Sequence, residues 1–185
     1  PDLIIADPYS KAAITQNSMR HVAKSLVVDD TYDWEDDTWI QIDPRDLIIY
    51  EMHVRDMTTH STSTANQKGT YLGLVEAGQN SGIEHLKSMG VNAVQILPIQ
   101  DFSNFEVPFK DHKAPLYNDW NPYGRNHWGY MTTFFFAPES YYASDGTDAP
   151  GTWNGKDGRA VNEIKDMVKA FHKAGIAVIM DVVYN

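Results

Sequence analysis

Three short apolar runs, separated by segments with a helical repeat, constrain the fold of this chain more than any other feature. Residues 47–53, 91–98 and 176–183 are rich in Val, Ile and Leu and alternate little between apolar and polar positions. Strands of a parallel sheet that are buried on both faces have this pattern. The sequence therefore predicts an α/β fold in which each run is a strand of one parallel sheet.

The segments before the second and third runs have the spacing of amphipathic helices. Residues 82–89 and 160–174 repeat apolar side chains every three or four positions. Gly90 and Gly175 follow them directly, where a helix C-terminal glycine is expected. The unit of helix, glycine and buried strand thus occurs twice. Because the sequence ends two residues after the third run, we expect an unfinished parallel sheet.

The composition of the chain indicates which kinds of binding partner it is suited to. The chain has 185 residues, a net charge of −10 and no cysteine. An acidic chain lacks the basic face that nucleic acid or an anionic membrane requires, and no apolar stretch approaches the roughly 18 residues of a membrane span. We expect neither partner and a soluble protein. The compartment, cytoplasmic or exported, is left open because the absence of cysteine gives no redox information.

Residues 1–45 differ from the remainder of the chain. They contain short strand and turn signals but no helical period, and they include an acidic run at residues 29–37. We interpret them as the end of a β-rich module followed by a solvated linker, with a cation site in the acidic run as the alternative. Pro44 restricts the backbone here, so the main domain is predicted to comprise residues 46–185.

A long aromatic segment follows the second run. Residues 100–159 contain 14 of the 22 aromatic side chains, which indicates an ordered segment because disordered segments are depleted in aromatics. The segment starts beyond the carboxyl end of a predicted parallel strand, where α/β folds place their ligand sites. Aromatic faces beside Asn and Asp suit sugars. The alternative is that the rings form a small second core beneath the loop.

Four motifs occur in a fixed order along the chain. They are residues 50–56 (YEMHVRD), 90–99 (GVNAVQILPI), 126–130 (NHWGY) and 181–185 (DVVYN). Together they resemble the first part of the α-amylase superfamily of glycoside hydrolases, in particular its pullulanase, isoamylase and glycogen-debranching branch. The resemblance implies that residues 46–185 are the first three strand–helix units of a (β/α)8 TIM barrel. Residues 1–45 are similar to the end of the β-sandwich starch-binding module that precedes such barrels.

The resemblance also implies roles for five residues. Tyr130 matches the stacking platform beneath the sugar that is cleaved, flanked by His127 and Trp128. Asp181 matches the aspartate that helps to hold the catalytic face together. Asn185 matches a calcium ligand of many α-amylases, but debranching members often lack that ion. We therefore assign no metal and no cofactor, and keep calcium as the alternative.

The activity implied by the resemblance is retaining hydrolysis of α-glucans such as starch, glycogen and pullulan, at α-1,6 branch points. In this superfamily the catalytic carboxylates come from later strands, so we assign no catalytic residue here. The 185-residue chain alone is expected to be inactive and to need the remainder of the barrel as its partner. Two alternatives are a glucan-branching transferase of the same superfamily and a non-catalytic carbohydrate-binding fragment. Linkage specificity and oligomeric state are left open.

Other polar residues have simpler interpretations. Glu51 and Asp101 lie near strand ends, but nothing in the sequence fixes the separation of about 5 Å that retaining carboxylates require, so we do not pair them. His53 and Arg55 are interpreted as structural partners of carboxylates. Asp181, taken without the resemblance, would accept backbone hydrogen bonds at a strand end.

Overall fold

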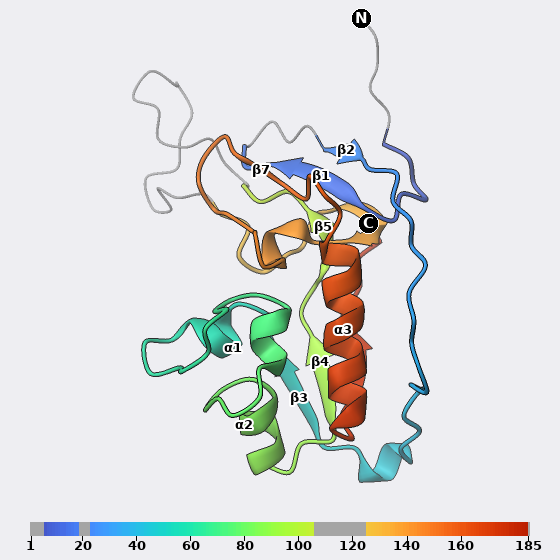
Figure 1. The fold of residues 1–185 in the computed structure, drawn as a ribbon, viewed down its shortest axis with the longest axis vertical. Helices are drawn as coiled ribbons and strands as arrows, with labels where there is room; N and C mark the ends of the chain where they lie inside the picture. Colours follow the sequence, from blue (N-terminus) through green and yellow to red (C-terminus); the bar gives the residue numbers. More distant parts are fainter. Residues whose placement is uncertain (1–5, 19–22, 106–124, 185) are drawn as a thin grey trace, which may run out of the picture.

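The computed structural model describes residues 6–18, 23–105 and 125–184 (Figure 1). The strands are β1 (Ala13–Gln16), β2 (Lys24–Ser25), β3 (Ile49–Met52), β4 (Ala93–Ile96), β5 (Gln100–Phe102), β6 (Thr132–Pro138), β7 (Trp153–Asn154) and β8 (Ala177–Met180). The α-helices are α1 (Asp56–Thr59), α2 (Ile83–Ser88) and α3 (Ala160–Lys173). Three short 3₁₀ helices are η1 (Pro44–Asp46), η2 (Leu72–Val75) and η3 (Ser140–Tyr142).

The predicted parallel sheet is confirmed. Its strand order is β3–β4–β8, and both neighbouring pairs are parallel. The two registers align residue 49 with residue 93 and residue 93 with residue 177, so the three strands begin at one level. Each apolar run of the sequence contains one of these strands. Because helices connect and cover the parallel strands, the fold belongs to the predicted α/β class.

The expectation that all three strands are buried on both faces is wrong. Strand β4 is mostly buried, but Ile49 and Glu51 of β3 and Met180 of β8 are exposed. Strands β3 and β8 are the edges of this sheet within the described ranges, and edge strands have a neighbour on one side only. Their apolar composition therefore exceeds what the packing within the described residues uses.

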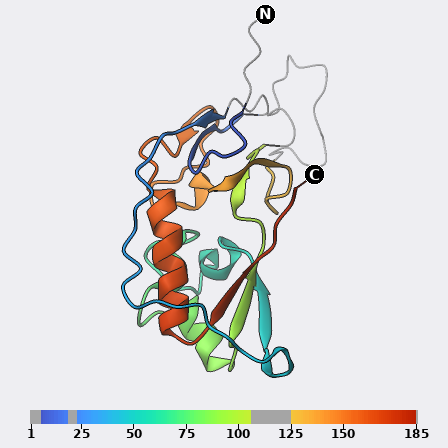
Figure 2. The ribbon, with the colours of Figure 1, turned by 90° about the vertical axis from the view of Figure 1, so that its right-hand side faces the viewer.

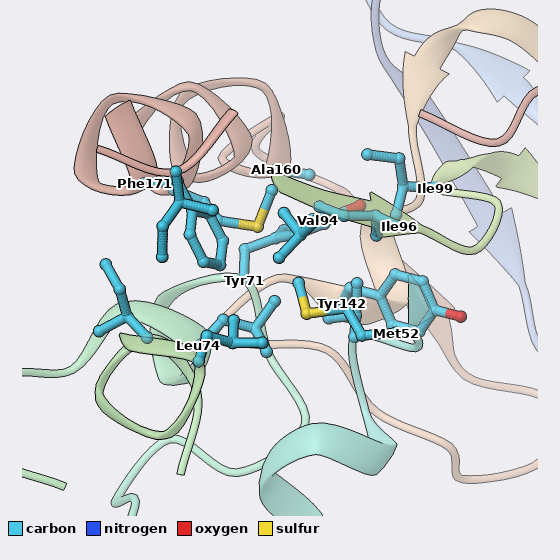
Figure 3. Packing of buried hydrophobic residues seen from close by; sticks show 14 of the residues in the cluster. Met52, Tyr71, Leu74, Val94, Ile96, Ile99, Tyr142, Ala160 and Phe171 are labelled. Carbon is cyan, nitrogen blue, oxygen red and sulfur yellow. The ribbon is translucent and has the colours of Figure 1, made fainter. Parts of the chain in front are cut away.

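Both predicted amphipathic helices are confirmed, and they cover one face of the sheet. Figure 2 shows α3 on one side of the three strands. Met167 and Phe171 of α3 and Leu86 of α2 are fully buried and belong to one apolar cluster. Figure 3 shows Phe171 of this cluster beside Val94 and Ile96 of β4. Removing such side chains from water contributes roughly 1.5–3 kcal/mol each. The predicted helix ends are also confirmed, because α2 and α3 stop just before residues 90 and 175.

A second region lies beyond the carboxyl ends of β3, β4 and β8. Strands β5 and β6 pair antiparallel, and β1 lies between β2 and β7 in a small antiparallel sheet. Strand β1 comes from residues 1–45, whereas β7 belongs to the aromatic segment, so contacts cross the predicted boundary at residue 46. The division into residues 1–45 and 46–185 stays a prediction.

The acidic run at residues 29–37 lies along α3 (Figures 1 and 2). Most of its residues are exposed, which agrees with the predicted solvated segment, but its contacts with the helix were not predicted. Glu35 accepts a hydrogen bond from Lys169 Nζ at 3.0 Å. Asp37 pairs with His172 at 2.9 Å, and the Tyr32 hydroxyl donates to Asp166. We call residues 29–37 the acidic strap. Glu35 and Asp37 of the strap face basic side chains of α3, whereas Asp30 pairs with Lys11. A cation site in the strap stays a prediction.

Within the part of the chain that the structure describes, no helix is both long and apolar enough to cross a membrane. Among the described residues the longest helix is α3, with 14 residues.

Candidate functional site

The candidate site is built on the turn at residues 126–130, which we call the aromatic loop. The buried Asn126 side chain closes the turn, because its Oδ1 accepts from Gly129 N at 3.2 Å and its Nδ2 donates to the Tyr130 carbonyl. Gly129 has φ +79°, and a Cβ there would lie 2.7 Å from the Pro98 carbonyl oxygen, so only glycine fits. The tight turn leaves Trp128 56% and Tyr130 41% exposed.

Two of the residues predicted for the site are brought together. The Tyr130 hydroxyl donates a hydrogen bond of 3.0 Å to Asp181 Oδ2, although the residues are 51 positions apart in the chain. Asp181 follows β8, and its backbone N–H donates to the Ile96 carbonyl of β4 at 3.0 Å. The bond to the carboxylate raises the pKa of the Tyr130 phenol, which therefore stays protonated and remains a donor at neutral pH.

His127 and Trp128 contact the end of the first parallel strand. The His127 ring stacks on His53, with 4.4 Å between ring centroids and 22° between ring planes. His127 Nε2 lies 3.0 Å from Asp56 Oδ2. The Trp128 ring meets His127 edge-on at 5.4 Å and His53 at 6.4 Å. The aromatic loop thus spans from the carboxyl end of β3 to the carboxyl end of β8.

His53 is a neutral imidazole with a defined tautomer. Its Nε2 lies 2.7 Å from the His127 carbonyl oxygen and 3.1 Å from the Tyr142 hydroxyl. A carbonyl only accepts, so Nε2 carries the proton, and Nδ1 accepts from Arg55 N at 3.2 Å. Burial lowers the pKa of His53, which favours the neutral form further.

The ligand atoms of His53, Asp56 and His127 lie within 4.8 Å of one another, as the donors of a metal site do. A metal needs a free lone pair from each imidazole. His53 offers none as it stands, since Nδ1 accepts a backbone N–H and Nε2 donates to a carbonyl. We therefore assign no metal to this cluster.

A cavity of about 470 Å³ adjoins the loop and is lined in part by His53, Asp56 and Trp128. It lies beyond the carboxyl end of β3, the side of a parallel sheet where ligands bind in α/β folds. Glu51 is exposed on β3 and also lines this cavity, whereas Asp101 is fully buried in β5 and accepts from the Thr15 hydroxyl.

The remaining sequence-based expectations have mixed outcomes. Arg55 packs its guanidinium over the Tyr141 ring at 4.6 Å, so its aromatic contact was missed when carboxylates were expected as its partners. Asp56, which contacts His127, was not singled out as a site residue. Its position just after β3, at the same sheet edge as the aromatic loop, was the signal that would have found it.

The described rings of the aromatic segment fall into two sets, and the interpretation as a sugar site stays a prediction. Phe134, Tyr141 and Tyr142 are buried and belong to the packed interior, whereas Trp128 and Tyr130 are exposed at the site. Asn185, predicted as a site residue, lies outside the described residues, as does residue range 106–124 with its share of the aromatic rings. The segment therefore both packs the interior and presents a surface.

No family model matches this chain. The chain is 36% identical to chloroplastic isoamylase 1 of Arabidopsis thaliana, in an alignment that covers 98% of the chain. It is also 36% identical to the glycogen operon protein GlgX homolog of Mycobacterium tuberculosis, in an alignment that covers the whole chain. The structure is similar to that of a pullulanase of Paenibacillus barengoltzii solved in complex with maltohexaose and α-cyclodextrin. The superposition covers 97% of the chain, with a TM-score of 0.70 and 32% sequence identity. The chain spans 22% of the two curated relatives and 26% of that pullulanase.

Proposed function

We propose that this chain, which is related to the debranching branch of the α-amylase superfamily, forms the sugar-binding first part of a retaining hydrolase of α-glucans. The bonds cleaved would be the α-1,6 branch points of starch, glycogen or pullulan. One observation supports the proposal most: the hydrogen bond that joins the exposed Tyr130 ring to Asp181 at the carboxyl end of a parallel strand.

The proposed architecture is a (β/α)8 barrel in which β3, β4 and β8 are the first three strands, preceded by the end of a β-sandwich module at residues 1–45. Two features support it. The strands of the parallel sheet lie in the order in which they occur in the sequence, β3–β4–β8, and α2 and α3 pack on one face of it. The uncovered face carries the exposed Glu51 and the half-buried Gln95 and Asp181, which suits the upper interior of a barrel.

The site residues would bind and orient the sugar. The exposed faces of Tyr130 and Trp128 offer apolar rings for the C–H faces of glucose units, and His127 would flank them. The Asp181 carboxylate accepts the Tyr130 hydroxyl and has further lone pairs for sugar hydroxyls. Holding the ring and the carboxylate in one geometry before binding reduces the cost of ordering the site.

The chemical step would need carboxylates that we do not assign in this chain. A retaining glycosidase uses two carboxyl groups about 5–5.5 Å apart, one as nucleophile and one as general acid and base. We propose that the remainder of the barrel supplies them. We also propose that no cofactor takes part, with a calcium ion at Asn185 as the alternative.

A second candidate, a carbohydrate-binding segment without chemistry, is favoured by the site itself, since each residue assigned to it binds rather than reacts. A branching transferase has less support, because the relatives named above are an isoamylase, a GlgX homolog and a pullulanase. The transferase would differ from the hydrolase in whether a sugar hydroxyl or water attacks the glycosyl intermediate.

Calorimetric titration of the chain with maltohexaose tests the proposal. We expect binding of this α-linked glucan and no binding of cellohexaose, the β-linked control of the same length. Reducing-end assays on pullulan should detect no hydrolysis by the chain alone and release of sugars when it is expressed together with the remainder of the barrel. Equal affinity for both oligosaccharides, or none for either, would contradict an α-glucan site.

A further inference from the structure

We infer that His53 is a positioning residue: its hydrogen bond to the His127 carbonyl fixes the aromatic loop so that Trp128 and Tyr130 face the sugar. The inference deepens the proposed function and rests on it for the identity of the ligand. His53 lies just beyond β3 and is 5% exposed, so most of its imidazole is covered although it forms part of the cavity wall. It would therefore act on the sugar mainly through the loop.

The atom that His53 holds determines where Trp128 points. The His127 carbonyl belongs to the peptide unit that joins His127 to Trp128, and this unit is planar. A short bond of 2.7 Å to its oxygen therefore fixes the orientation of the whole peptide plane at the start of Trp128. The stacking of His53 on the His127 ring holds the same residue from a second direction.

His53 is itself held from three sides. Arg55 N donates to Nδ1, the Tyr142 hydroxyl lies 3.1 Å from Nε2, and the Tyr142 ring packs edge-on against the imidazole at 5.7 Å. The phenol of Tyr142 is in turn buried in the apolar cluster, so the packed interior fixes the position of the imidazole. The chain of contacts runs from this core through His53 and the His127 peptide to the exposed rings.

The loop has two anchors on different strands. His53 and Asp56 hold its beginning near β3, while Asp181 holds Tyr130 beyond β8. A loop fixed at both ends loses little conformational freedom on binding, which favours affinity. Loss of the His53 anchor leaves the loop attached through the contact of His127 with Asp56, through Asp181 and through its own turn.

Two substitutions test the inference. His53→Gln retains an amide N–H for the His127 carbonyl, whereas His53→Leu fills the site without a donor. We expect His53→Leu to weaken maltohexaose binding about fivefold to tenfold, the size expected for one hydrogen bond. His53→Gln should retain most of the affinity of the unsubstituted chain.

Hydrogen exchange gives a second measurement. Exchange of residues 126–131 should accelerate in His53→Leu, while exchange in α2 and β4 should not. Lys87→Leu, at an exposed position of α2 outside the cavity wall, is the control and should change neither measurement.

Unchanged affinity and unchanged exchange of residues 126–131 in His53→Leu would overturn the inference. Equal losses in His53→Leu and His53→Gln, together with equal falls in melting temperature, would also overturn it, because they indicate a core residue only. If His53→Leu does not fold, His53→Asn replaces it, since its shorter amide does not reach the carbonyl. If the unsubstituted chain binds no maltohexaose, the proposed function fails, and the exchange measurement still decides whether His53 holds the loop.

Discussion

The region around the parallel sheet and the region around β1, β5, β6 and β7 are stabilised by different interactions. The sheet region encloses one large apolar cluster, which includes Leu86, Val94, Ile96 and Phe171 (Figure 3). The apolar cluster between β1 and β6 contains three buried residues, Ala13, Phe134 and Ala137. The second region instead buries polar side chains, including Thr15, Asn17, Asp101, Asn104, Glu139 and Asn154.

Hydrogen bonds connect the buried polar groups across long sequence distances. Asn17 Oδ1 accepts from Asn104 at 2.9 Å and from Asn154 at 3.2 Å, and its Nδ2 donates to the Thr147 carbonyl at 2.7 Å. The Glu139 carboxylate accepts from two backbone N–H groups, at 2.7 and 3.0 Å. Burial of apolar side chains therefore holds the helices of the sheet region against its strands, whereas hydrogen bonds between buried polar groups fix the geometry of the second region. The aromatic loop extends from this second region.

The largest expected effect is a cavity in the apolar cluster. Phe171→Ala removes a fully buried ring from α3, and we expect a loss of about 3–5 kcal/mol in the free energy of unfolding, measured by urea titration. The control is Phe136→Ala, because Phe136 is 58% exposed and should cost little. Similar losses at both positions would contradict the assignment of the main core to α3 and the sheet.

The next largest effect is expected from a substitution among the buried polar side chains of the second region. Asn17→Ala leaves the amides of Asn104 and Asn154 without their shared acceptor, and we expect a loss of about 2–3 kcal/mol, because each unsatisfied buried group costs roughly 1–3 kcal/mol. Asn162→Ala at an exposed site of α3 should leave stability unchanged or slightly raised. A neutral Asn17→Ala would show that the second region does not depend on this network.

Stability of the polar region should depend on pH. Burial raises the pKa of Asp101 from 3.8 to about 7, so between about pH 4 and 7 the folded chain binds a proton that the unfolded chain releases. Stability therefore falls as pH rises through this window, by about 2 kcal/mol from pH 5 to 7. Asp101→Asn should flatten the slope in urea titrations at the two pH values, leaving the part due to Glu139, whose pKa burial also raises. Identical slopes in both proteins would rule out this role for Asp101.

The smallest effect is expected at the acidic strap. Glu35 contacts Lys169 and Lys173 on the surface of α3, and water screens such pairs. Glu35→Gln should lower the melting temperature slightly in low salt and have no effect at 1 M NaCl. The isosteric control is Glu84→Gln, which removes only a 3.9 Å pair within α2. A large, salt-independent loss at Glu35 would show that the strap belongs to the core.

The sheet region was the more predictable of the two. Its strands and helices have local periods that a sequence displays directly, and Gly90 and Gly175 mark both helix ends. The polar interior has no such period, because Asn17 and Asn154 are 137 positions apart and an isolated asparagine predicts only a turn. The contacts of the strap with α3 were not predicted, because an acidic run does not show which basic side chains it will face.

The candidate site was predictable in part. Tyr130 was predicted from the motif at residues 126–130, and Asp181 from its position after an apolar run. The structure joins these two residues by a hydrogen bond. The sequence did not predict the role inferred for His53, since that role depends on a backbone carbonyl 74 positions away. Partners of this kind depend on how a loop folds back over a strand.

The most direct test of the account compares maltohexaose affinity in Tyr130→Ala and Phe136→Ala by calorimetry. Both substitutions remove an exposed aromatic ring, but only Tyr130 bonds to Asp181 beyond β8. The account predicts that Tyr130→Ala weakens binding at least about tenfold, the size expected when a stacking ring is lost, while Phe136→Ala binds as the unsubstituted chain does. Unchanged affinity in Tyr130→Ala, or an equal loss in Phe136→Ala, would contradict the assignment of the aromatic loop as the sugar platform.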